Sequence, residues 1–297
     1  MTATAESTTA VHPVRRRTGE RLARAVARGP LHLVLVVIAV FWLVPTVGLM
    51  VSSLRSAPDN AASGWWSVLS TPAQLTADSY RALLDDPGMV DAFWNTVLIT
   101  VPATVGVVLI GALAAYAFAW VDFPGRDWAF VGVVGLLVVP IQVALIPVAD
   151  LYGKLGIFGG IVGVVLFHIA FGLPFAIFLL RNFFAGIPRE LLEAARIDGA
   201  GELRIFLRVV LPIGLPALAS LSIFQFLWVW NDLLVGLVFA GADATPLTVA
   251  IREQTRQFGA NIDVIAPGAF ISLVVPLVVF FAFQRYFVQG LLAGAEK

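Results

Sequence analysis

Few side chains in this sequence belong to the types that carry out chemistry. Nucleotide hydrolysis at a P-loop needs a lysine within Gly-x4-Gly-Lys-Ser/Thr, and neither Lys154 nor Lys297 has that context. The histidines, His12, His32 and His168, are too far apart to form the i, i+4 pair of a helical metal site. Cysteine is absent, which excludes disulfides and thiol catalysis. The residues therefore form no recognisable catalytic constellation, and energy for any work must come from a partner protein.

The most informative residues form a polar segment inside a strongly apolar second half, from Glu190 to Gly199 and on to Pro212. Pro188 suits the first position of a helix, because its missing N–H would be unpaired there. Glu190 faces the positive end of the helix dipole, and Gly199 ends the helix where a left-handed residue is favoured. The pattern predicts a helix of about ten residues.

One face of this helix carries two small residues, Ala194 and Ala195, which leave a groove that another protein surface can enter. Arg189, Glu193 and Arg196 are spaced three or four residues apart on one flank, so their side chains can interact. An isolated Glu-Ala-Ala favours an ordinary short loop helix. A more specific interpretation needs the longer spacing described below.

The elements that must hold this segment are membrane helices. The chain has 297 residues, of which 59% are hydrophobic and 13% charged, a composition outside the range of soluble domains. Apolar segments near the ~20 residues needed to cross a bilayer lie at about 31–54, 93–119, 127–150, 161–181, 209–236 and 266–287. We expect Pro140 and Pro147 to kink the third span. The sequence predicts an all-α polytopic membrane protein with six transmembrane helices.

Residues 1–30 form an arginine-rich tail ahead of a six-span domain at 31–297. Arg21, Arg24 and Arg28 share a helical face that can rest on anionic headgroups. A flexible tail marking the cytoplasmic side explains the same residues equally well. The apolar run that follows is too long for a signal-peptide core, so we interpret it as an uncleaved first span.

Positive charge sets the expected orientation. Most arginine and lysine residues lie in the tail, in the loop between spans two and three, in the loop between spans four and five, and at the C-terminal end. With six spans, these four segments all lie on one side of the membrane. The positive-inside rule therefore predicts a multi-pass protein of the plasma or inner membrane, with both termini in the cytoplasm. The polar loop then also lies in the cytoplasm.

The full spacing of the polar loop is uncommon. It has Glu-Ala-Ala at 193–195, three residues, Gly199, nine residues, Val209, one residue and Leu-Pro at 211–212. This resembles the Glu-Ala-Ala-x3-Gly-x9-Ile-x-Leu-Pro loop of ABC-importer permeases, with valine in place of isoleucine. The resemblance implies the type I ABC importer permease fold. It also implies that residues of about 186–208, hereafter the coupling loop, form helices that sit in a cleft on a cytoplasmic ATPase.

The similarity extends from about residue 30 to the end. Within the ABC-importer permeases, the chain most resembles the carbohydrate-importer branch, that is, the inner-membrane subunit of maltose-type importers. The stretches that carry it are 95–96, 114–118, 123–126, 139–143, 146–147, 181–184, 187–188, 230–233 and 283–290. The last stretch, Phe-Gln-Arg-Tyr-Phe-Val-Gln-Gly, carries most of the sugar signal. Sugar as substrate rests on this resemblance alone.

The resemblance implies both site residues and partners. The residues expected to couple to the ATPase are Glu190, Glu193, Ala194, Ala195, Asp198, Gly199, Leu211 and Pro212. The expected partners are a second homologous permease subunit, two copies of the ABC ATPase, an extracytoplasmic solute-binding protein, a sugar and membrane lipid, but no nucleic acid. ATP and Mg²⁺ would bind the ATPase, and this chain, which is not an enzyme, would bind no cofactor.

Polar residues inside the spans are candidates for the translocation path, because polar groups are costly there. They are Gln142, Gln225, Asn231 and Asp232. Packing between helices explains each of them at least as well, and we expect His168 to serve packing or an interhelical hydrogen bond.

Two alternatives remain open. The same type of importer could carry a polyol, a glycerol-phosphate or a peptide. An ion-coupled secondary transporter would need an ionisable relay at mid-membrane, and spans two, three, four and six show no acidic residue clearly at that depth.

Overall fold

The structure is a computed structural model that describes residues 18–256 and 262–295. In these ranges the regular elements are all helices, which confirms the predicted all-α class. The chain divides into two units, residues 1–48 and 49–297. The first unit holds most of α1 (Thr18–Ser53), whose part from Pro30 onward is apolar and long enough to cross a membrane. Most of the predicted tail, residues 1–17, lies outside the described residues.

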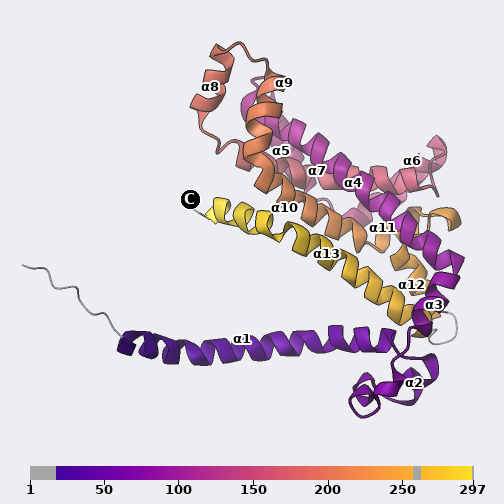
Figure 1. The fold of residues 1–297 in the computed structure, drawn as a ribbon. Coiled ribbons are helices and arrows are strands. Elements are labelled where there is room, and N and C mark those ends of the chain that lie inside the picture. The colour runs from indigo at the N-terminus through magenta and orange to yellow at the C-terminus, as the bar shows by residue number, and fades with distance from the viewer. Residues whose placement is uncertain (1–17, 257–261, 296–297) are drawn as a thin grey trace, which may run out of the picture. The chain divides into compact units, whose positions relative to one another are not determined.

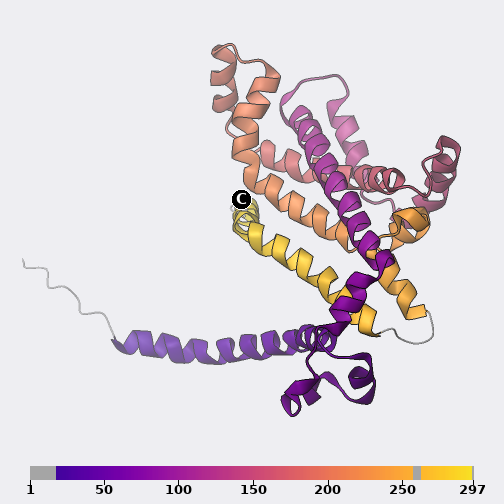
Figure 2. The ribbon, with the colours of Figure 1, turned by 45° about the vertical axis from the view of Figure 1, so that its right-hand side comes forward.

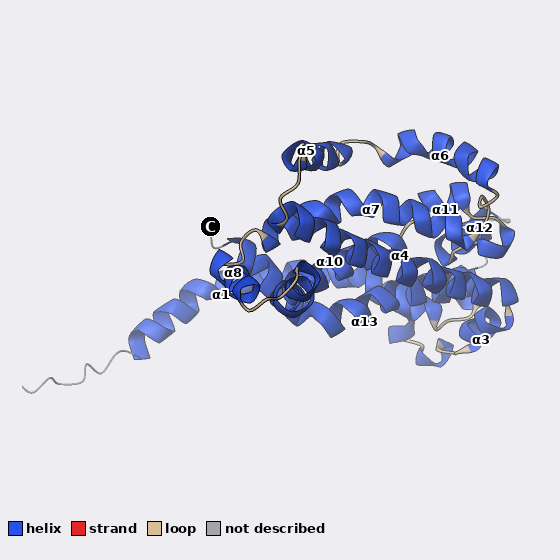
Figure 3. Cartoon of the chain, turned by 90° about the horizontal axis from the view of Figure 1, so that it is seen from above, coloured by secondary structure: helices blue, strands red, loops and turns tan. Residues whose placement is uncertain are grey.

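Four long helices form the centre of the second unit. They are α4 (Pro87–Trp120), α7 (Ile161–Phe184), α10 (Leu211–Trp230) and α13 (Ile262–Ala295). The helix α4 packs along α7, and α10 contacts α4, α7 and α13, so that α10 lies between the other three (Figures 1 and 3). Alanine, aliphatic and aromatic side chains fill the contact between α4, α7 and α10. The apolar segments of the sequence thus become one packed bundle.

Glycines allow the closest approaches in this bundle. A Cβ added at Gly111 of α4 would lie 2.8 Å from the Cβ of Ala176 on α7. A Cβ added at Gly172 of α7 would lie 2.8 Å from both Val107 and the amide of Gln225. Small residues that bring backbones together are typical of helix pairs in membranes, so these glycines set the spacing of α4, α7 and α10.

The third predicted span is not one helix. The helix α5 (Arg126–Leu136) and the helix α6 (Ile141–Leu155) meet at a bend of 100°. Pro140 lies directly before α6 and has extended backbone. The chain cannot continue as one helix through this position, because proline lacks the N–H that a helix needs and disfavours helical geometry in the residue before it. Counting only helix length and composition, the described residues contain five candidate spans, or six if this pair is one span.

Short helices connect the long ones. They are α2 (Ala57–Ala62), α3 (Asp78–Asp85), α11 (Leu234–Phe239), α12 (Leu247–Arg256) and the 3-10 turns Trp65–Leu69, Pro72–Gln74 and Ala242–Ala244. Arg55, which is fully buried, organises the segment around α2. Its guanidinium donates hydrogen bonds to the carbonyls of Asp59, at 2.7 Å, and Ser63, at 3.1 Å. Residues 55–86 therefore form an ordered segment of short helices and turns, hereafter called the cap.

Candidate functional site

The coupling loop forms two short helices that protrude from one end of the bundle (Figures 1 and 2). The helix α8 covers Arg189–Ile197, and α9 covers Glu202–Ile205. A π-helical segment, Phe206–Val210, then joins α9 to α10. Pro188 caps α8 with extended backbone, so the helix begins one residue later than predicted. Otherwise the predicted helix is present at its predicted place.

Gly199 makes the turn between α8 and α9. Its φ of 78° is left-handed, as predicted, and α8 has already ended at Ile197. No atom lies within 4 Å of a Cβ added there. Backbone conformation, and not lack of space, is therefore what favours glycine at this position.

The two faces of α8 differ in burial. Leu192 is fully buried, and Ala195 is half-buried against the same apolar core. Ala194, Glu190 and Glu193 are exposed. The predicted groove of two alanines is therefore divided, since only Ala194 is open to a partner.

The exposed face of the coupling loop mixes apolar and charged groups. Ile197 is 86% exposed and Leu203 is 65% exposed, at the ends of α8 and α9 that flank the turn. Glu193 pairs with Arg189 on the same helix, with 3.3 Å between Oε1 and Nε. Two apolar side chains thus lie open beside charged ones on the part of the chain that protrudes from the bundle.

The remaining predicted coupling residues are less central to this surface. Asp198 is exposed at the end of α8. Leu211 and Pro212 lie in the first turn of α10, beyond the protruding helices, with Leu211 half-buried and Pro212 exposed. Pro212 lies just after the π-helical segment, and its missing N–H removes one backbone hydrogen bond to the preceding turn.

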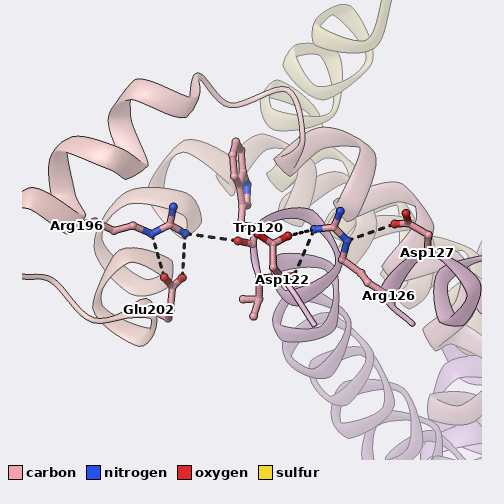
Figure 4. A network of polar contacts seen from close by, with 7 residues as sticks. Trp120, Asp122, Arg126, Asp127, Arg196 and Glu202 are labelled. Atoms are coloured by element: carbon pink, nitrogen blue, oxygen red, sulfur yellow. Dashed lines mark hydrogen bonds and ion pairs between the residues drawn. The ribbon is translucent and has the colours of Figure 1, made fainter. Parts of the chain in front are cut away.

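Side chains that the motif does not include tie the coupling loop to the bundle. Glu202 accepts a hydrogen bond from the hydroxyl of Tyr116 on α4, and its Oε1 lies 3.1 Å from Nε of Arg196 on α8. Arg196 also donates to the carbonyl of Trp120, at 3.5 Å, and Figure 4 shows its guanidinium between the two acceptors. The hydrogen bond with Glu202 raises the pKa of Arg196 above its usual value, so the charge is retained. We call Tyr116, Trp120, Arg196 and Glu202 the elbow network.

Sequence reasoning missed the elbow network because Tyr116 and Glu202 lie 86 residues apart. Arg196 was expected to interact along the flank of α8, yet it crosses the turn to Glu202 instead. The one local signal was an acidic residue directly after Gly201, in the first turn of α9.

A second group of polar side chains lies inside the bundle. Asp232 follows α10, and its Oδ2 accepts hydrogen bonds from the backbone N–H groups of Val235, at 2.9 Å, and Gly236, at 3.2 Å. His168 on α7 is 1% exposed, and its Nε2 lies 3.8 Å from the same oxygen. The structure thus places Asp232 next to the histidine that was expected to serve packing or an interhelical hydrogen bond, at a distance beyond that of a hydrogen bond.

The other candidate path residues do not join this pair. Gln225 is buried beside Gly172, and its amide nitrogen has no hydrogen-bond partner in the described ranges. Asn231 is exposed and donates to the carbonyl of Leu227 at 2.8 Å. Gln142 is exposed on α6. The four residues therefore do not form one site.

A row of threonines on α4 escaped prediction. Thr96, Thr100 and Thr104 recur at every fourth residue and are buried. Thr96 accepts the backbone N–H of Leu247 at 2.8 Å and so fixes the start of α12. The hydroxyls of Thr100 and Thr104 have no hydrogen-bond partner among the described residues. Within those residues, no group of three or more His, Asp or Glu side chains could hold a metal ion.

Proteins of known role resemble this chain over most of its length. An osmoprotective compounds uptake permease protein of Synechocystis sp. is 48% identical, with 90% of this chain and 92% of that protein covered. An alpha-glucoside transport system permease protein of Rhizobium meliloti is 50% identical over 77% of this chain, which spans 62% of that protein's length. A trehalose transport system permease protein of Mycobacterium tuberculosis is 35% identical over 76% of this chain and 84% of its own length.

Solved structures share the fold. A chain of a bacterial ABC transporter involved in the import of the acidic polysaccharide alginate matches with a TM-score of 0.71 and 21% identity, covering 93% of this chain and 100% of that one. Residues 93–292 match the family described as "Binding-protein-dependent transport system inner membrane component". That match includes α7, the coupling loop and α10. This chain therefore belongs to the family of binding-protein-dependent transport system inner membrane components, the permease subunits of ABC importers.

Proposed function

We propose that this chain forms half of the translocation path of an ATP-driven importer whose substrate is a sugar. A partner ATPase would drive the chain by displacing its coupling loop. The observation that carries the proposal is the pair of helices α8 and α9, which leave the bundle and expose Ile197 and Leu203. Since neither lysine of the chain lies in a P-loop, a separate ABC ATPase would hydrolyse ATP with Mg²⁺.

The proposed assembly contains a second permease subunit, two ATPases and an extracytoplasmic solute-binding protein. The family description supports the binding protein. A bacterial alginate ABC transporter that shares this fold was solved in complex with a periplasmic protein that carries an alginate pentasaccharide. In the proposed orientation both termini and the coupling loop face the cytoplasm, where the ATPases are.

In the proposed mechanism, closure of the ATPase dimer displaces the coupling loop. The packed contacts of α4, α7 and α10 would carry this displacement through the bundle as a rigid-body movement. The path would then open alternately to the two sides of the membrane. Glu193 and Ala194, both exposed on α8, would contact the ATPase directly.

The names of the relatives guide the choice of substrate. Relatives named for alpha-glucoside and trehalose transport favour a glucose-containing sugar. The relative that is 48% identical is named for osmoprotective compounds, so such a solute is the second candidate. Polyols, glycerol-phosphates and peptides, which the sequence left open, have no comparable support.

Reconstitution of the complete complex in proteoliposomes tests the proposal. We expect uptake of a radiolabelled alpha-glucoside or trehalose that requires both ATP and the binding protein. Uptake of an osmoprotective compound alone would select the second candidate. Uptake that persists without the ATPase and follows an ion gradient would overturn the proposal in favour of a secondary transporter.

Two substitutions test the coupling loop itself. Gly199→Pro fixes φ near −65° at a residue whose φ is 78°, and Glu193→Lys reverses a charge on the exposed face of α8. We expect both proteins to reach the membrane and both complexes to lose most ATP-driven uptake. Asp127→Lys, at an 84% exposed side chain of α5, is the matched charge-reversal control and should retain uptake. Uptake and ATPase rates at wild-type level in both loop variants would contradict the assignment.

A further inference from the structure

We infer that the elbow network transmits the movement of the coupling loop to α4 and α7 by preventing the turn at Gly199 from bending. This inference rests on the proposed function. It assigns a positioning role to Glu202 and Tyr116, which lie outside the sequence motif of the coupling loop.

The first step of the argument is the position of the ion pair across the turn. Arg196 and Glu202 lie three residues before and three residues after Gly199, and their side chains meet at 3.1 Å. Glycine is the residue with the greatest backbone freedom, and its turn here has open space around it. The ion pair spans this turn, and together with the contacts of its two partners to α4 it would hold α8 and α9 in one arrangement, so that they would move as one piece.

The second step is the attachment of this piece to α4. Tyr116 and Trp120 are one helical turn apart, so they lie on the same face of α4. The hydroxyl of Tyr116 donates to Glu202, and its ring packs on Phe206 with the centroids 5.3 Å apart. The carbonyl of Trp120 accepts from Arg196. Each partner of the ion pair therefore has its own contact with α4.

The third step extends the connection to α7. The indole N–H of Trp120 donates to the carbonyl of Phe184, the last residue of α7, at 3.0 Å. The helices α4 and α7, which form the most extensive helix–helix contact in the described bundle, thus both end at the elbow network. A displacement of α8 would reach α4 and α7 together.

A purely structural role is the competing explanation, and burial argues against it. The side chains of Arg196 and Glu202 are 35% and 48% exposed. Ion pairs as exposed as this contribute little to folding stability, because solvent screens them. Loss of the pair should therefore leave the fold intact, while the geometry that the pair imposes on the turn would be lost.

The experiment uses the complete reconstituted complex with Glu202→Gln, Tyr116→Phe and the double variant. The measured quantity is the amount of solute imported per ATP hydrolysed. We expect this ratio to fall about fivefold for each single variant, as for the loss of one hydrogen bond, with the ATPase still co-purifying. Glu202→Gln weakens the ion pair with Arg196 but keeps an oxygen that can accept from Tyr116, whereas Tyr116→Phe removes the contact of Glu202 with α4. The double variant should therefore be more impaired than either single variant, because the two changes act on different contacts of Glu202. The control is Tyr152→Phe, whose ring packs on Phe239 in a different cluster of the bundle.

The possible outcomes separate the explanations. A coupling ratio equal to that of the wild type in both single variants would overturn the inference. Loss of the ATPase on co-purification would also overturn it, because the residues would then serve docking or folding. A wild-type complex that imports solute without ATP would refute the proposed function instead, before any variant is compared.

Discussion

At the scale of single residues, Asp232 shows how one carboxylate can organise a helix boundary. The helix α10 ends at Trp230, and α11 begins four residues later. Oδ2 of Asp232 accepts two of the first backbone N–H groups of α11, which have no partner within that helix. The same oxygen faces His168 of α7. A residue chosen from the sequence as a path candidate thus serves as a helix cap.

Two substitutions of Asp232 distinguish the effect of helix capping on stability from the effect of the negative charge. Asp232→Ala should lower the free energy of unfolding by about 1 kcal/mol, the usual contribution of a lost cap. Asp232→Asn keeps a capping oxygen and should have a smaller effect. Thermal unfolding of the detergent-solubilised protein measures both. An equal fall in Tm for the two variants would show that the negative charge matters more than the cap.

Gly199 and Glu202 illustrate what single residues reveal in a sequence. The left-handed turn at Gly199 follows from local chemistry, because glycine after a run of helix formers is a recognised helix end. The role of Glu202 depends on Tyr116, which is distant in sequence and adjacent only in the folded bundle. Local rules can therefore predict the turn, but not the side chains that hold it.

At the scale of elements, α4 and α7 can pack closely because a glycine lies at their contact. At Gly111 the two helices approach so closely that an added Cβ would lie 2.8 Å from that of Ala176. In membranes, such close packing replaces the hydrophobic driving force between helices.

A larger residue at this contact should push the helices apart. Gly111→Val is expected to destabilise the protein by about 1–3 kcal/mol through overpacking. Gly132→Val on α5 is the matched control, since nothing lies within 4 Å of an added Cβ at that glycine. Thermal unfolding in detergent should show a lower Tm for the first variant only. Equal Tm values would mean that the bundle adjusts without cost.

The predicted spans agree best with the structure where one apolar segment folds as one helix. The segments near 93–119 and 161–181 became α4 and α7. The segment at 127–150 is also apolar enough to count as a candidate span but is broken before Ile141. Proline predicts a kink from its local chemistry. The size of the bend depends on what the two pieces pack against, which hydrophobicity alone does not reveal.

At the scale of the whole molecule, the lack of cysteine makes the orientation directly measurable. A single introduced cysteine would be the only thiol of the chain, so a membrane-impermeant maleimide would report one position at a time. Exposed side chains occur both in the coupling loop and in the cap that precedes α4.

The proposed orientation makes opposite predictions for two such positions. Leu69→Cys, at an 86% exposed side chain in the cap, should react in intact cells. Ala194→Cys, on the exposed face of α8, should react only after the membrane is permeabilised, in cells that lack the ATPase proposed to cover this face. The reverse pattern would place the coupling loop outside the cell, where no ATPase could reach it, and would contradict the proposed mechanism.

The class of the molecule and the position of its coupling loop were predictable, because the length of apolar segments and a long motif are properties of the sequence itself. The spatial grouping of the polar residues was not. Gln142 and Gln225 looked equivalent as amides within spans, yet one is exposed on α6 and the other is buried against Gly172. Which face of a span is buried is decided by its neighbours, and these come from distant parts of the chain.

The π-helical segment Phe206–Val210 determines the rotation of α9 about the axis of α10. A π turn contains one residue more than an α-helical turn, and each residue of an α-helix advances the chain by about 100° around the axis. Deleting one residue here would turn α9 by roughly that angle relative to α10 and direct Glu202 away from Tyr116. Inserting or deleting a residue in an exposed loop between helices would carry no such angular penalty.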